Sequence, residues 1–210
     1  MARAPVESEV AACRRQLEAV LDDAESLAGG LSDSQLAWRP APSRWSVADC
    51  LNHLNVTCGK YLPRTGEMIA QARSQGLTGR GPFRHPFVGN WFVRLMEPPP
   101  RRKLRVPGVF APLPDQPAAS LLPEFRRLSR LLLAQVAESD GLDLAAVKTP
   151  SPAARHFTLT LGQCFAALAA HDRRHLWQAR QVLEHADFPR QEPSAVSHQR
   201  SAHALPRADV

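Results

Sequence analysis

Apolar residues recur every three or four positions in four long segments of this chain, and this periodicity constrains the fold more than any other feature. The segments run over about residues 6–27, 46–75, 117–139 and 160–185. In the first, the apolar positions are Val6, Val10, Cys13, Leu17, Val20, Leu21, Ala24 and Leu27. Such spacing places the apolar side chains on one face of an α-helix. We therefore expect an all-α protein, because no strand pattern competes with these four helices.

Signals at the segment ends support these boundaries. Gly29 and Gly30 are expected to stop the first helix. Ser46 with Asp49, and Thr160 with Gln163, have the spacing of capping boxes, which start helices. Pro63 is expected to kink or end the second helix.

The connections between the segments predict the topology. They are short after the first and third segments, where the bridge 142–157 follows, and long after the second, over residues 76–116. Short connections join antiparallel neighbours, so the sequence predicts a four-helix bundle with one long crossover between helices two and three. Residues 87–96 can form a short helix inside that crossover. We assign residues 1–187 to one bundle domain and expect the polar tail 188–210 to be disordered.

Composition narrows the class of protein. The 210 residues carry a net charge of +6, but they contain no recognisable nucleic-acid-binding motif, so we expect no nucleic-acid partner. No apolar run is long enough to cross a membrane, and no apolar leader precedes the first helix, so we expect a soluble, cytoplasmic protein that is not membrane-bound. The four cysteines form no CxxC motif and lie in apolar segments, which favours reduced, buried side chains.

Two histidines in the fourth segment, His171 and His175, are spaced to act together. Side chains four residues apart on a helix stack one turn above the other, so both rings can reach one metal ion. A helical wheel places both at the edge of the apolar stripe, where they face a neighbouring helix. Asp172 lies near the centre of that stripe. We expect it either to pair with an arginine or to hydrogen-bond a histidine ring.

His53 in the second segment is the candidate third ligand. Periodicity alone places it on the helix surface, although it would face the His171/His175 pair if the two helices lie side by side. Three neutral imidazoles would hold a divalent ion and leave one coordination position open. Zn²⁺, Ni²⁺ and Fe²⁺ all accept such a set. The sequence HDRRH is not the HExxH of zinc proteases, so we do not expect a protease.

Two parts of the chain resemble the DinB-like superfamily (DinB/YfiT-like metalloenzymes). They are residues 38–54, WRPAPSRWSVADCLNHL, and residues 161–179, which contain LGQ and HDRRHLWQA. The resemblance covers about residues 10–186. It implies a four-helix bundle with a three-histidine divalent-metal site, here His53, His171 and His175. It also implies a bacterial protein that forms a homodimer, and family members include thiol S-transferases that use a low-molecular-weight thiol.

Two functions follow as hypotheses. The first is a metal-dependent thiol S-transferase or hydrolase that acts on a small molecule beneath the crossover. Phe87, Trp91 and Phe92 would then line a pocket, although plain packing over the bundle is the favoured interpretation, and His85 or Arg84 would bind an anion. The second is a non-catalytic metal-binding stress or sensor module.

The sequence does not decide between these two hypotheses. It identifies no convincing general base besides Asp172, so the catalytic residues are not assigned. A metal-ligand or reactive-thiol role for Cys50 and Cys164 also stays open, since each lies one or two helical turns from a predicted ligand.

Overall fold

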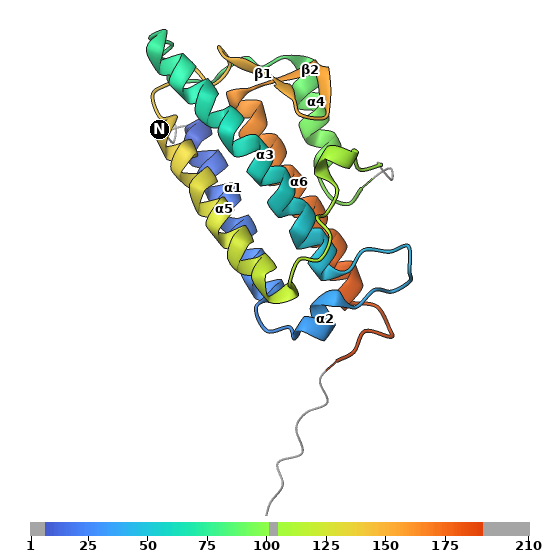
Figure 1. The fold of residues 1–210 in the computed structure, drawn as a ribbon. Coiled ribbons are helices and arrows are strands. Elements are labelled where there is room, and N and C mark those ends of the chain that lie inside the picture. The colour runs from blue at the N-terminus through green and yellow to red at the C-terminus, as the bar shows by residue number, and fades with distance from the viewer. Residues whose placement is uncertain (1–6, 101–104, 191–210) are drawn as a thin grey trace, which may run out of the picture.

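Four long helices form the body of the protein in the computed structural model, which describes residues 7–100 and 105–190 (Figure 1). These helices are α1 (Glu9–Ala28), α3 (Val47–Ser74), α5 (Ala118–Glu138) and α6 (Leu161–Leu183). Helix α3 packs between α5 and α6, and α1 packs against the same two helices from the other side. The predicted four-helix bundle with its long crossover is therefore confirmed. No helix among the described residues has the length and apolarity needed to span a membrane.

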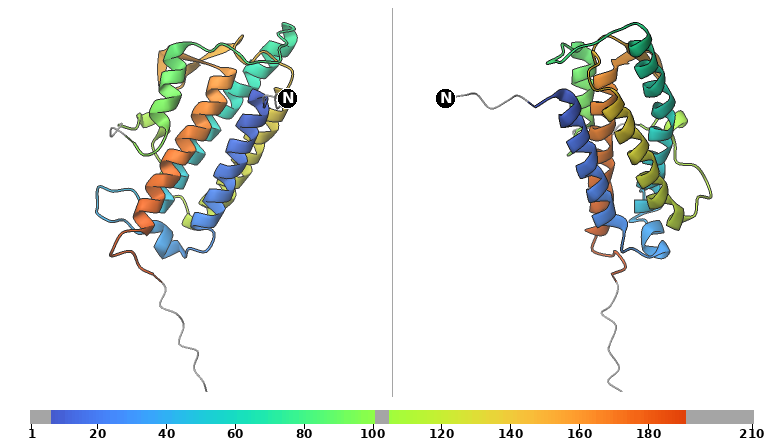
Figure 2. Two further views of the ribbon diagram at one scale, coloured as in Figure 1. Left: turned by 180° about the vertical axis from the view of Figure 1, so that it is seen from behind. Right: turned by 90° about the vertical axis from the view of Figure 1, so that its left-hand side faces the viewer.

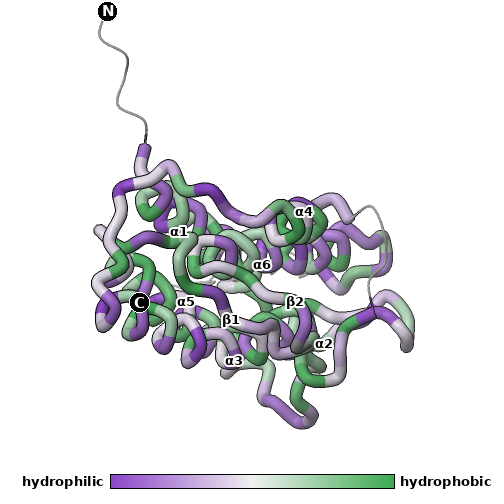
Figure 3. Tube along the Cα trace, turned by 90° about the horizontal axis from the view of Figure 1, so that it is seen from above, coloured by the Kyte–Doolittle hydropathy of each residue, from purple (hydrophilic) through white to green (hydrophobic). Residues whose placement is uncertain are grey.

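A small β-hairpin makes the all-α prediction only approximate. Strands β1 (Lys148–Ser151) and β2 (Ala154–Thr160) pair antiparallel, with Thr149 opposite Leu159. The hairpin lies over one end of the bundle when the molecule is viewed from above (Figure 3). Two prolines in this stretch obscured the strand pattern, but a proline is tolerated in the edge strand of a two-stranded sheet. Thr160 ends β2 and also caps α6 through its side chain, so the strand leads directly into that helix.

One further detail differs from the sequence-based expectation, and one alternative left open at Pro63 is decided. A short helix, α2 (Asp33–Ala37), forms in the connection after α1, capped by Ser32. Helix α3 continues through Pro63 without ending there. The carbonyl of Leu62, just before the proline, accepts hydrogen bonds from Thr65 Oγ1 (3.1 Å) and from Gln135 Nε2 of α5 (2.9 Å). The proline removes only the N–H that would donate to the carbonyl of Gly59, and the hydrogen bond from Gln135 attaches this turn of α3 to α5.

The crossover contains the expected short helix, α4 (Phe87–Met96), which lies outside the bundle beside α6 (Figure 2). Farther along, the 3₁₀ turn η1 (Gly108–Phe110) contacts α3. Helix α4 is joined to α6 by Gln163, whose Nε2 donates to the carbonyl of Pro86 (2.8 Å) and to Asn90 Oδ1 (2.9 Å). Gly89 allows this close approach, because a Cβ there would lie 2.3 Å from Gln163 Oε1.

The substitution Gly89→Ala tests this attachment. Alanine favours a helix by up to about 1 kcal/mol over glycine, yet here its methyl group would displace the hydrogen-bonded Gln163 side chain. We therefore expect Gly89→Ala to lower the free energy of unfolding by about 1–3 kcal/mol, as overpacking does. Denaturant unfolding measures the change.

Gly59→Ala is the matched control. Gly59 lies in α3 and a Cβ at that position meets no atom within 4 Å, so the same substitution should stabilise the protein by roughly 0.5–1 kcal/mol. Equal stabilisation by both substitutions would contradict the close packing of α4 on α6.

Candidate metal centre

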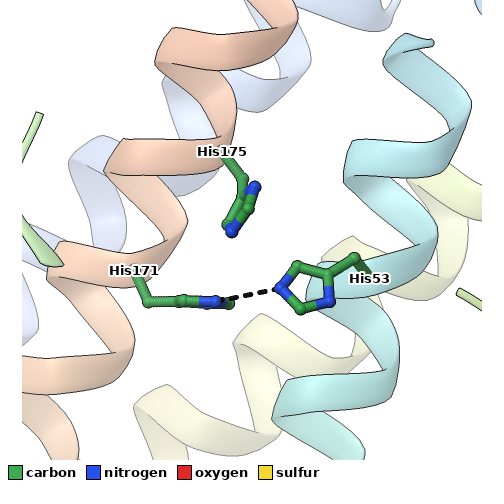
Figure 4. Close-up of side chains that lie close together, drawn as sticks. All are labelled: His53, His171 and His175. Carbon is green, nitrogen blue, oxygen red and sulfur yellow. Dashed lines mark hydrogen bonds between the residues drawn. The ribbon is translucent and has the colours of Figure 1, made fainter. Parts of the chain in front are cut away.

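Three histidine rings converge between α3 and α6 (Figure 4). His53 projects from α3 toward His171 and His175, which lie one turn apart on α6. One ring nitrogen from each histidine lies within 4.8 Å of the others, and the Nε2 atoms of His53 and His171 are 3.0 Å apart. The three residues that the sequence singled out are therefore brought together at one point.

The burial of His53 corrects the surface position that periodicity favoured. Only 2% of His53 is exposed, and the run from Cys50 to Asn55 is buried throughout. Helix α3 packs against both α5 and α6, so it buries much more than the single stripe that a wheel analysis assumes. His53 belongs to the side that faces α6, which is the alternative noted from the sequence.

The hydrogen bond made by the other nitrogen of His53 sets its tautomer. Nδ1 lies 2.6 Å from the backbone carbonyl of Phe110 in η1. A carbonyl oxygen only accepts, so Nδ1 carries the proton and donates, and Nε2 keeps a free lone pair directed at the other two histidines. This carbonyl is a functional group that sequence reasoning missed, because a backbone oxygen leaves no residue-type signal.

Burial keeps the three rings neutral. It lowers the pKa of His175 to about 3 and lowers the pKa of His53 and of His171 below the ordinary histidine value. The neighbouring rings and Arg174 add repulsion that lowers the pKa of His171 and of His175 further. The Nδ1 atoms of His171 and His175 are buried without a hydrogen-bond partner in the described part of the chain. Neutral imidazoles with convergent nitrogens form a donor set that fits a divalent metal ion.

Asp172 takes up neither of its two expected interactions. Its carboxyl is buried 4.0 Å from His171 Nδ1, which is too long for a hydrogen bond, and no arginine among the described residues forms an ion pair with it. The adjacent Arg173 pairs instead with Glu97, at 3.0 Å between Nε and Oε2. Burial consequently raises the pKa of Asp172 to about 8, so this side chain is mostly protonated at neutral pH.

Trp45 covers the histidines and was not predicted as part of the site. Its ring lies 5.0 Å from the ring of His53 and stacks on that of His175 at 5.5 Å. Trp45 directly precedes Ser46, which caps α3, and Asp49 of the same capping box pairs with Arg39 at 2.8 Å. The second tryptophan of the WRPAPSRW stretch was the available signal, because a rigid connection before the His53 helix places that ring near the three histidines.

The crossover side chains proposed to form a pocket lie elsewhere. Phe87 and Trp91 are 76% and 54% exposed, and Phe92 packs on Phe157 with ring centroids 4.8 Å apart. His85 is engaged by Thr160 Oγ1 (2.7 Å) and Glu9 Oε1 (2.6 Å), so both ring nitrogens have structural partners. A cavity of about 510 Å³ borders α3 and α5, but none of the three convergent histidines lines it.

The cysteines stay outside the histidine cluster. Cys50 and Cys164 are fully buried, and burial raises the pKa of both thiols, that of Cys164 to about 12. Neither forms a thiolate at neutral pH in this environment, so the structure does not support a reactive thiol at these positions. Their packing role agrees with the reduced, buried cysteines expected from the sequence.

Comparison with known proteins identifies the family to which this chain belongs. The model of the DinB superfamily matches residues 16–179, and no curated protein matches the chain. The fold is also similar to the solved structure of YfiT from Bacillus subtilis, with a TM-score of 0.54 and 14% sequence identity over 88% of this chain and 91% of YfiT. That structure is described as a probable metal-dependent hydrolase with an unusual four-helix bundle topology. Because the family model spans most of the bundle, the chain belongs to the DinB superfamily, as its motifs indicated.

Proposed function

We propose that the chain binds one divalent metal ion through His53, His171 and His175 and acts as a metal-dependent hydrolase on a small molecule. The observation that carries the proposal is the convergence of three buried, neutral imidazoles within 4.8 Å of one another. The description of YfiT as a probable metal-dependent hydrolase supports the reaction class. Membership of the DinB superfamily supports the metal site, because resemblance to that family implies three histidines that bind a divalent ion.

The protein's own groups define what such a site can do. Three imidazoles occupy three coordination positions and leave room for a water molecule or a substrate oxygen. A bound divalent ion lowers the pKa of water and polarises a carbonyl or phosphoryl group. Trp45 shields one side of the histidine cluster, and the Phe110 carbonyl orients the ring of His53. Imidazole ligands suit Zn²⁺, Ni²⁺ and Fe²⁺, so the donor set alone does not select the metal.

Thiol transfer is the second reaction to consider, and it would need an external thiol. The buried cysteines are poor nucleophiles, so a low-molecular-weight thiol would have to serve as co-substrate. A non-catalytic metal-binding module is the remaining alternative. The position of Asp172 favours that alternative, since its carboxyl lies 4.0 Å from His171 Nδ1, too far for the hydrogen bond that would hold a general base beside the histidines.

A substrate panel on the metal-loaded protein tests the proposed reaction. We expect a metal-dependent hydrolysis rate with at least one of a set of activated esters, amides and phosphoesters. A second set of reactions tests thiol transfer by mixing an electrophile with bacillithiol, mycothiol or glutathione and measuring the rate with and without metal. If the protein binds metal but shows no metal-dependent rate in either set of reactions, the proposed enzymatic function is contradicted and the non-catalytic metal-binding module is supported.

Histidine variants provide the controls for that panel. His171→Ala/His175→Ala should reduce both the bound metal and the rate to background. His185→Ala should leave both unchanged, because His185 follows α6 and packs on Trp38, with ring centroids 5.5 Å apart. Activity that persists in the double variant would place the reaction at another site.

The pH dependence of stability tests the neutral state of the rings. A histidine whose pKa is lowered on folding destabilises the protein once the pH falls below the unfolded value, because the unfolded chain then binds the proton more tightly. With the pKa of His175 at about 3, metal-free protein should lose up to about 2 kcal/mol between pH 6.5 and pH 5 through this residue. His175→Gln should remove that part of the loss.

Urea unfolding at both pH values, in the presence of a chelator, measures the difference. The same acid sensitivity in wild type and His175→Gln would show that His175 is not buried in a neutral state.

A further inference from the structure

We propose that Asn52 is a positioning residue: it fastens residues 110–113 to α3 and thereby sets the ring of His53 for metal binding. The inference deepens the proposed function and rests on it. It assigns a role to a side chain that lies in the family-like stretch 38–54 but that the helical pattern does not single out.

Asn52 pairs with both backbone groups of one residue. Its Nδ2 donates to the carbonyl of Leu113 at 2.7 Å, and the N–H of Leu113 donates to Asn52 Oδ1 at 3.1 Å. A side-chain amide offers a donor and an acceptor side by side, which is what this paired contact requires. Only 6% of Asn52 is exposed, although it borders the cavity between α3 and α5, so most of its side chain is shielded from water.

Few other interactions hold residue 113 in place. Leu113 lies between Pro112 and Pro114, which have no N–H, so Leu113 has the single backbone donor of this tripeptide. Its side chain is 54% exposed and adds little packing. The contact with Asn52 is therefore the main hydrogen-bonded attachment of residue 113 to α3 in the described structure.

The same segment carries the carbonyl that orients His53. Phe110, three residues before Leu113, accepts the hydrogen bond from His53 Nδ1 at 2.6 Å. Its ring packs nearly parallel to that of Tyr61, which lies two turns farther along α3, at 6.1 Å. Tyr61 and Asn52 thus attach residues 110–113 to α3 at two points, through the Phe110 ring and the Leu113 backbone. The Phe110 carbonyl lies between these two attachments. A carbonyl held in this way favours the Nδ1–H tautomer and leaves Nε2 free to bind a metal.

The test uses Asn52→Ala in the full-length chain, with two readouts. Metal titration with Zn²⁺ should show about tenfold weaker binding, the lower end of the range for groups that support a metal ligand. Nitrogen-15 NMR of the metal-free protein should show His53 changing from a single Nδ1–H tautomer to a mixture. The second readout does not depend on metal, so it also decides the positioning role if the wild type binds no metal and the proposed function fails.

Asn55→Ala is the matched control. Asn55 lies one turn farther along α3, is also buried, and donates to the carbonyl of Leu121 at 2.9 Å. It makes no hydrogen bond to residues 110–113 among the described contacts, so its loss should leave the His53 tautomer and the metal affinity at wild-type values. Equal affinity and an equal tautomer ratio in the two variants would overturn the proposal.

Hydrogen exchange in the wild type covers the case in which Asn52→Ala does not fold. Coupling between two sites is reciprocal, so Zn²⁺ at the histidines should slow exchange of the Leu113 amide. The Ser120 amide, bonded to the carbonyl of Pro117 at 3.0 Å, serves as the internal reference. If Zn²⁺ binds without any change at Leu113 relative to Ser120, Asn52 does not act on the metal centre.

Discussion

The packing of α3 against α6 is the interaction on which the site depends. It brings His53 to within hydrogen-bonding distance of His171, which lies 118 positions farther along the chain. Because α5 packs on the other side of α3, His53 is enclosed and loses its contact with water. That burial disfavours the charged imidazolium, and it therefore leaves three lone pairs available to one cation. The same packing that stabilises the bundle thus creates the chemistry of the site.

The long crossover takes part in this arrangement through specific attachments. Gln163 at the start of α6 joins α4 to the bundle, and His85 links the crossover to Glu9 of α1 and to Thr160, the cap of α6. Farther along, Phe110 supplies the carbonyl that orients His53. Residues 85–96 therefore hold the first half of the crossover on α6, while Phe110 in the second half completes the surroundings of His53. This long connection is therefore fixed to the bundle by specific hydrogen bonds along its length.

Much of the fold could be predicted because helix periodicity and capping are local. The capping boxes of Ser46 and Thr160 are present as expected, and His171 and His175 lie on one side of α6 with ring centroids 4.6 Å apart. Most of the failures are non-local. Periodicity could not show that α3 buries two sides, so it placed His53 on the surface. Whether the carboxyl of Asp172 finds a partner, and which backbone carbonyl meets a histidine ring, depends on how distant segments pack. The hairpin was missed for a local reason, because β1 has only four residues and contains Pro150.

The central claim is that His53, His171 and His175 together bind one metal ion. X-ray absorption spectroscopy combined with elemental analysis tests it most directly. The purified protein should contain about one divalent ion per chain, with three imidazole nitrogens at about 2.0–2.1 Å if the ion is zinc. Each single histidine-to-alanine variant should lose metal or one imidazole from the spectrum. Equal metal content and an unchanged spectrum in wild type and in all three variants would contradict the claim.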